Sequence, residues 1–178
     1  VVVTPNFDGL NQVIANLGDD GLPHCALVRT PYQQLWVQWV DALDLSWHLV
    51  ECPDLVEACA AEMGRILRDM FPIARRAPVP YLDFPDNITA PMIGRTHFQR
   101  FCMPMYRELA ARLADFGALA YCHMDGDLKP LWELIGTSGI RGLDSLSPPP
   151  DNDTSPGDAI RLWPEMRVHI NFPSSVHL

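Results

Sequence analysis

The feature of this sequence that most constrains its fold is a repeat in which short apolar segments alternate with segments of helical spacing. The apolar segments are predicted strands, and they span 22–28, 79–84, 118–122, 142–146 and 166–170. Strands that alternate with helices pair in parallel, because a crossover helix returns the chain to the same end of the sheet. A closed eight-stranded barrel typically needs about 250 residues. We therefore expect an α/β fold that is either an open sheet or a partial TIM (β/α)8 barrel.

Three helices are predicted in most detail. Residues 6–17 have the spacing of a short amphipathic helix. A long helix begins at Pro53, which suits a first helical turn, and ends near Phe71. A third spans 98–116, where Pro104 predicts a kink or a division into two helices. The β-branched run of residues 1–3 is interpreted as a strand or the remnant of one.

Composition and charge argue against several classes of protein. A hydrophobic content of 48% over 178 residues suits a single domain, which we assign to residues 1–178. The net charge of −9 disfavours nucleic acid and anionic membranes as partners. The sequence shows neither a transmembrane run of about 18 apolar residues nor a signal peptide. Five Cys residues without a CxxC pair indicate reduced side chains in a cytoplasmic protein.

The strongest candidate site follows the predicted strand 118–122, where the chain turns abruptly polar. His123 and Asp125 stand two residues apart, so both can point the same way from a strand end. They are predicted to be catalytic, with Asp125 orienting His123 or accepting a proton beside it, or to bind a metal ion. The alternative is that Asp125 caps the next helix and His123 bonds to the backbone. Asp127 is the preferred N-cap of that helix.

Polar residues after other predicted strands complete the candidate site. Asp86 is predicted to be catalytic, and Asp83 and Asn87 beside it are predicted to contact the substrate. Arg29 follows the strand 22–28 and could hold a substrate carboxylate in a bidentate pair. Asn171 ends the last strand and is predicted to face the same pocket. The alternatives are a Pro-Asp-Asn turn and a surface ion pair for Arg29.

Several motifs in order resemble one family. They are Asp86-Asn87-Ile88-Thr89-Ala90-Pro91-Met92-Ile93, Phe98, Pro104-Met105-Tyr106, Gly117, His123-Met124-Asp125-Gly126-Asp127-Leu128, Pro148-Pro149-Pro150 and Asn171-Phe172-Pro173. This order resembles the uroporphyrinogen decarboxylase superfamily, which includes porphyrinogen decarboxylases and zinc-dependent methyltransferases acting between corrinoid proteins and thiols such as coenzyme M. The resemblance begins near Pro31. It implies an eight-stranded barrel about twice as long, from which this chain lacks the first strands and the final βα units.

The resemblance leaves three functions open. The methyltransferases carry His-x-Cys where this chain has His123-x-Asp125, so a zinc site here would use a carboxylate and a third ligand beyond Leu178. We expect a methyltransferase-like or otherwise uncharacterised member of this superfamily, with a small-molecule substrate and a corrinoid protein as partner. The first alternative is a decarboxylase acting on porphyrinogen acetate side chains, without zinc. The second is a non-catalytic fragment that forms homo-oligomers through exposed sheet edges.

Overall fold

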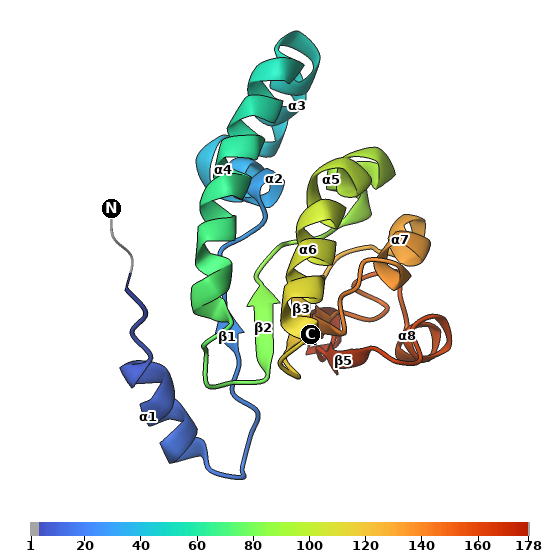
Figure 1. Ribbon diagram of the computed structural model, residues 1–178. Helices are drawn as coiled ribbons and strands as arrows, with labels where there is room; N and C mark the ends of the chain where they lie inside the picture. Colours follow the sequence, from blue (N-terminus) through green and yellow to red (C-terminus); the bar gives the residue numbers. More distant parts are fainter. Residues whose placement is uncertain (1–3, 178) are drawn as a thin grey trace.

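The computed structural model describes residues 4–177, so residues 1–3, predicted as a strand or its remnant, lie outside the described part. Its centre is one sheet of five parallel strands in the order β1-β2-β3-β4-β5. The strands are β1 (Cys25–Ala26), β2 (Tyr81–Phe84), β3 (Leu119–His123), β4 (Gly142–Leu146) and β5 (Arg167–Ile170). They alternate with helices, which confirms the predicted α/β fold and is consistent with a partial TIM-like barrel (Figure 1). The first strand is shorter than predicted.

The two faces of the sheet carry different side chains. Leu82, Ala120 and Cys122 point into the apolar core between sheet and helices. Cys122 is fully buried, and its Sγ lies 3.2 Å from the hydroxyl of Tyr106, so it faces the helix layer. Asp83 pairs in register with Tyr121 on the opposite face. That face is where the polar residues of the strands gather.

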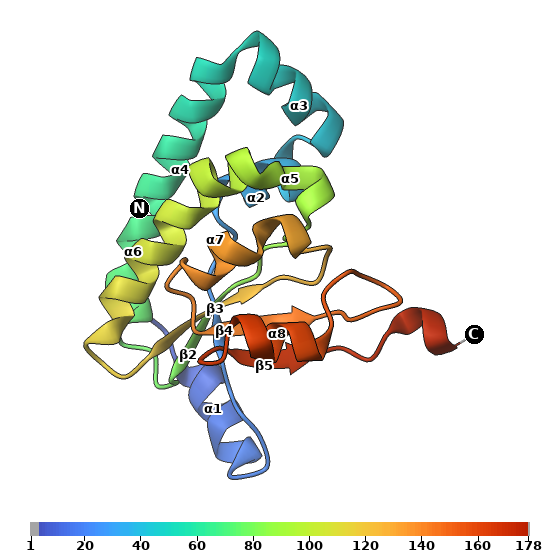
Figure 2. The same ribbon diagram turned by 90° about the vertical axis from the view of Figure 1, so that its right-hand side faces the viewer.

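Helices of very different length connect the strands. The α-helices are α1 (Asp8–Leu17), α2 (Pro31–Gln34), α3 (Ala42–Glu51), α4 (Pro53–Ala74), α5 (Ala90–His97), α6 (Met103–Ala114), α7 (Trp132–Gly136) and α8 (Pro156–Leu162). Two π-helical turns, η1 (Leu35–Trp39) and η2 (Phe98–Cys102), follow α2 and α5, and two 3-10 turns are η3 (Lys129–Leu131) and η4 (Ser174–His177). Figures 1 and 2 both show α4 and α6 side by side over the sheet.

The helix boundaries follow local sequence signals. The long helix α4 begins at Pro53 as predicted, and it continues through Pro72 to Ala74. The predicted helix 98–116 is divided, because the π-helical turn η2 precedes α6 and Pro104 occupies the first turn of α6. Ser155 caps α8 by accepting a hydrogen bond from the backbone N–H of Asp158. The prediction that Asp127 caps a helix is wrong, since Asp153 accepts from the backbone N–H groups of residues 128 and 129.

The helix α3 lies far from the sheet in both views (Figures 1 and 2). Asp41 caps its first turn by accepting from the backbone N–H groups of Leu43 and Asp44. Trp47 and Val50 on α3 are exposed, although both are apolar. Among residues 4–177, none of the helices combines the length and the hydrophobicity that crossing a membrane requires.

Candidate functional site

The polar turn after β3 places two predicted residues in direct contact. His123 is the last residue of β3, and its Nε2 lies 3.4 Å from Oδ2 of Asp125. The turn is held by its backbone, because Met124 donates to the carbonyl of Asp144 and Asn152 donates to the carbonyl of Asp125. Both His123 and Asp125 are half-buried, so they remain open to a ligand from solvent.

Asp144 of β4 extends this contact to a third strand. Its Oδ2 lies 3.8 Å from Nδ1 of His123, and its Oδ1 lies 3.5 Å from Nδ1 of His169 on β5. Asp125, His123, Asp144 and His169 therefore form a row of alternating acids and imidazoles. Asp144 and His169 were not predicted as site residues, because each lies inside a predicted strand that holds another polar residue, Ser145 and Arg167 respectively.

The pKa values in the row follow from these contacts. The contact with Asp125 raises the pKa of His123, with the carboxylates of Asp144 and Asp83 adding to the effect, and it lowers the pKa of Asp125. Asp83 on β2 is almost completely buried, and its burial, together with the nearby charge of Asp144, raises its pKa to about 7. The site therefore holds one carboxyl group that exchanges its proton near neutral pH.

Asp86, predicted to be catalytic, lies in the core instead. It is 0% exposed, and Oδ2 accepts from the hydroxyls of Tyr106 at 2.6 Å and Thr30 at 2.7 Å, while Oδ1 accepts from the backbone N–H of Thr30. Burial raises the pKa of Asp86 to about 6, against the opposing effect of these bonds. Its carboxylate links Thr30, just before α2, to Tyr106 on α6, so Asp86 holds these two helices together.

The predicted substrate-binding residues are divided between different places. Arg29 lies close enough to Asp86 to lower the pKa of that carboxyl, and its Nε is buried without a hydrogen-bond partner. The backbone N–H of Asn87 donates to Oε1 of Gln33. Asn171 is exposed and donates from Nδ2 to the Ser147 hydroxyl at 3.0 Å. Of the four predicted substrate contacts, Asp83 is the one whose pKa is coupled to the row.

Neither a family model nor a curated protein sequence matches this chain. One solved structure shares its fold. That structure is a methyltransferase from Methanosarcina mazei, with a TM-score of 0.60 and 13% sequence identity. The match covers 92% of this chain and 56% of the methyltransferase, so this chain spans little more than half the length of that structure. At this identity the likeness shows the fold alone.

The zinc prediction for His123 and Asp125 meets an incomplete ligand set. Within residues 4–177, the His, Cys, Asp and Glu side chains form no group of three or more that could hold a metal ion. A structural or catalytic zinc site needs at least three protein ligands. The residues present do not fit a zinc ion, so no chemical step is assigned to one, and zinc binding stays a prediction.

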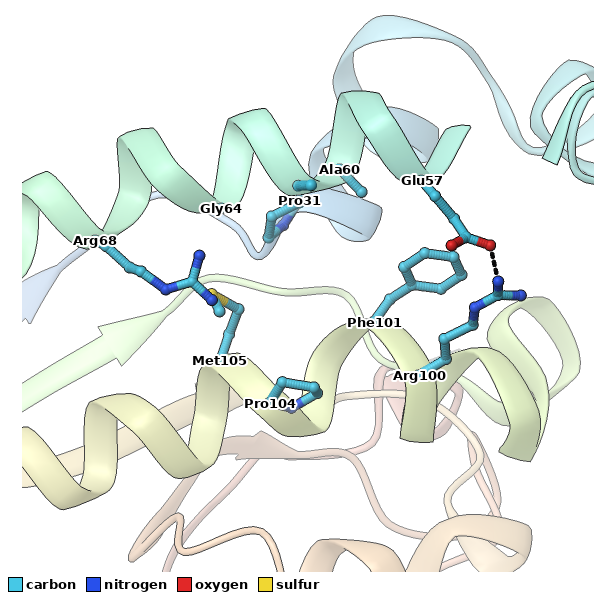
Figure 3. Close-up of a pocket in the computed structure, with 10 residues that line it drawn as sticks. Pro31, Glu57, Ala60, Gly64, Arg68, Arg100, Phe101, Pro104 and Met105 are labelled. Carbon is cyan, nitrogen blue, oxygen red and sulfur yellow. Dashed lines mark ion pairs between the residues drawn. The ribbon is translucent and has the colours of Figure 1, made fainter. Parts of the chain in front are cut away.

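A groove between α4 and α6 lies away from the row (Figure 3). Its volume is about 220 Å³, and Gly64 and Ala60 on one side face Met105 and Pro104 on the other. The cations along it already have partners. Arg100 pairs with Glu57, and Arg68 pairs with Glu108 at 2.7 Å. With its charges neutralised, this groove lacks the chemistry of the strand-end site.

Proposed function

We propose that this chain belongs to an enzyme of the uroporphyrinogen decarboxylase superfamily, and that the enzyme transfers a methyl group to a thiol from a corrinoid protein or a similar donor. The observation that carries the proposal is the row of Asp125, His123, Asp144 and His169 at the strand ends. Barrels of alternating strands and helices hold their catalytic groups at the carboxyl ends of strands. The fold shared with a methyltransferase supports methyl transfer.

The proposed roles follow from the contacts. His123 takes the thiol proton, the sulfur forms a bond to the methyl carbon, and the donor leaves with the electron pair of the broken bond. Asp125 makes His123 a stronger base, because it raises the pKa of the imidazole. Asp144 faces the other ring nitrogen of His123 and holds the orientation of the ring.

The experiment supplies methylcobalamin as donor and coenzyme M as acceptor, and it measures the methyl thioether by mass spectrometry. His123→Ala is expected to lower the rate by about 100-fold or more, since this is the range of general acid-base catalysis. Asp69→Asn, on the exposed side of α4, is the matched control and should keep the wild-type rate. Equal rates for His123→Ala and wild type would refute the role of His123. Porphyrinogen turnover by protein without zinc would overturn methyl transfer.

One observation favours the decarboxylase as the second candidate. Decarboxylation breaks the carbon–carbon bond to a carboxylate and releases carbon dioxide. The carbon that keeps the electron pair of this bond then needs a proton. Asp83 is nearly buried, and with its pKa raised to about 7 it is partly protonated at neutral pH. Asp83→Asn would then abolish porphyrinogen turnover.

A further inference from the structure

A small cavity that is partly open to solvent lies on the polar face of the sheet. The residues that line it come from β2, β3, β4 and β5 and from the segment before β1, and they are Leu22, His24, Tyr81, Asp83, Tyr121, Asp144 and His169. It leaves about 10 Å³ for the centre of a water-sized molecule. A volume of roughly 10–15 Å³ on this measure is what one water molecule needs.

Two buried polar atoms in the cavity wall have no partner. Oδ1 of Asp83 and the hydroxyl of Tyr121 are both buried and make no hydrogen bond. Their residues are 4% and 3% exposed, respectively, and they pair across β2 and β3 in register. Unsatisfied buried groups of this kind are rare in proteins, because each costs about 1–3 kcal/mol. They therefore indicate that a small molecule forms hydrogen bonds in this cavity.

The charges in the cavity wall indicate which kind of molecule. Asp83 and Asp144 both line the cavity, and neither Lys nor Arg is among its lining residues in the described chain. Arg167 lies outside this lining and is exposed, and its charge opposes the rise in the pKa of Tyr121. Two carboxylates that share a small space repel each other unless a cation or a proton lies between them. Burial raises the pKa of Asp83 first, and the charge of Asp144 raises it second.

The aromatic rings in the wall favour the same kind of ligand. Tyr81 and Tyr121 meet edge to face, with ring centroids 5.0 Å apart, and Tyr121 lies 5.7 Å from the ring of His169. Aromatic rings beside carboxylates bind ammonium groups through cation-π attraction and charged hydrogen bonds.

We propose that this cavity binds a water-sized cationic head group, an ammonium or a primary alkylammonium, held by Asp83 and Asp144 beside the rings of Tyr81 and Tyr121. The ammonium N–H groups donate to Oδ1 of Asp83 and to the hydroxyl oxygen of Tyr121. Naming this group as part of the substrate rests on the proposed function, whereas the binding itself does not. An amine-bearing methyl acceptor or donor is the substrate class that fits.

The test is a titration of the whole chain with methylammonium chloride, followed by NMR of the tyrosine ring signals. Methanol, which has a similar size and no charge, and potassium chloride are the ligand controls. Methylammonium is expected to shift the Tyr81 and Tyr121 signals to saturation, at a concentration at least tenfold below that of either control. Tetramethylammonium should not bind, because the cavity holds one water-sized group.

Variants separate the carboxylates from the rest of the wall. Asp83→Asn and Asp144→Asn keep the side-chain size and should each weaken methylammonium binding about 10- to 100-fold. Asp69→Asn, on an exposed carboxylate of α4, should not change it. Binding of methanol as tight as that of methylammonium would overturn the proposal in favour of a water site. Methylammonium binding without methyl transfer would refute the proposed function and leave this site in place.

Discussion

Replacing Gly142 with Ala should test whether the ring of Tyr121 lies across β4. Gly142 is the first residue of β4 and pairs with Tyr121 in register. A Cβ at this position would lie 2.1 Å from Cε1 and 2.2 Å from Cζ of Tyr121. Ordinary contacts of a Cβ atom begin near 3.4 Å, so the ring has to move by at least about 1.3 Å.

The cost of that movement follows from what holds the ring. Tyr121 is buried, and it packs edge to face on Tyr81. Overpacking of a filled interior costs about 1–3 kcal/mol, and the loss of an aromatic pair costs about 0.5–1.5 kcal/mol more. We therefore expect Gly142→Ala to lower the free energy of unfolding by about 1.5–4.5 kcal/mol.

Urea unfolding at equilibrium measures this change, and two further variants make it specific. Gly9→Ala in α1 is the control, since a Cβ there meets nothing within 4 Å, and helix propensity predicts a gain of about 0.5–1 kcal/mol. Combined with Tyr121→Ala, the Gly142→Ala change should cost little, because the clash is gone. Wild-type stability for Gly142→Ala alone, or an equal cost in the double variant, would show that the ring is elsewhere.

Three more predictions concern other parts of the chain. Asp86→Ala should lower the free energy of unfolding in urea by more than about 3 kcal/mol, because the buried hydroxyls of Thr30 and Tyr106 lose their hydrogen-bond acceptor. A decrease below about 1 kcal/mol would contradict a structural role for Asp86. The pKa of Asp83 is about 7 in the folded chain and about 3.9 in the unfolded chain, so its contribution to stability is complete below pH 4 and is lost as pH rises through 7. Asp83→Asn should therefore flatten the decline of the urea midpoint over this pH range. An unchanged decline in the variant would refute the raised pKa of Asp83. Ile170→Lys, on the exposed edge strand β5, should weaken self-association in sedimentation velocity, whereas a wild-type monomer at every concentration would rule out association through the sheet edge.

The strands and the β3 turn could be predicted because their signals are local. The strand 142–146 was predicted with its observed bounds, since a short segment between turns with Leu143 and Leu146 as its apolar residues needs little context. The contact between His123 and Asp125 follows from their spacing at a strand end. Both inferences depend on residues that are close in sequence.

The surroundings of Asp86 and Asp144 could not be predicted, because they depend on residues that are far apart in the sequence. Asp86 follows a strand just as Asp125 does, but its partners Thr30 and Tyr106 stand 56 and 20 residues away. Nothing local in the sequence shows that they enclose its carboxylate. Asp144 reaches both His123 and His169 because β4 lies between β3 and β5 with a particular register. That register comes from the packing of the whole sheet, which a single sequence does not display.

The consecutive strand order of the sheet also has a consequence for how the chain reaches this structure. Each strand from β2 to β5 pairs with the strand that precedes it in sequence, so its pairing partner has already been synthesised when it emerges. The sheet can therefore grow from β1 to β5 while the chain is being synthesised. The same order makes growth vulnerable at β3, since a chain that fails to add this strand offers no partner to β4 and β5 and leaves β2 as an open template for another molecule.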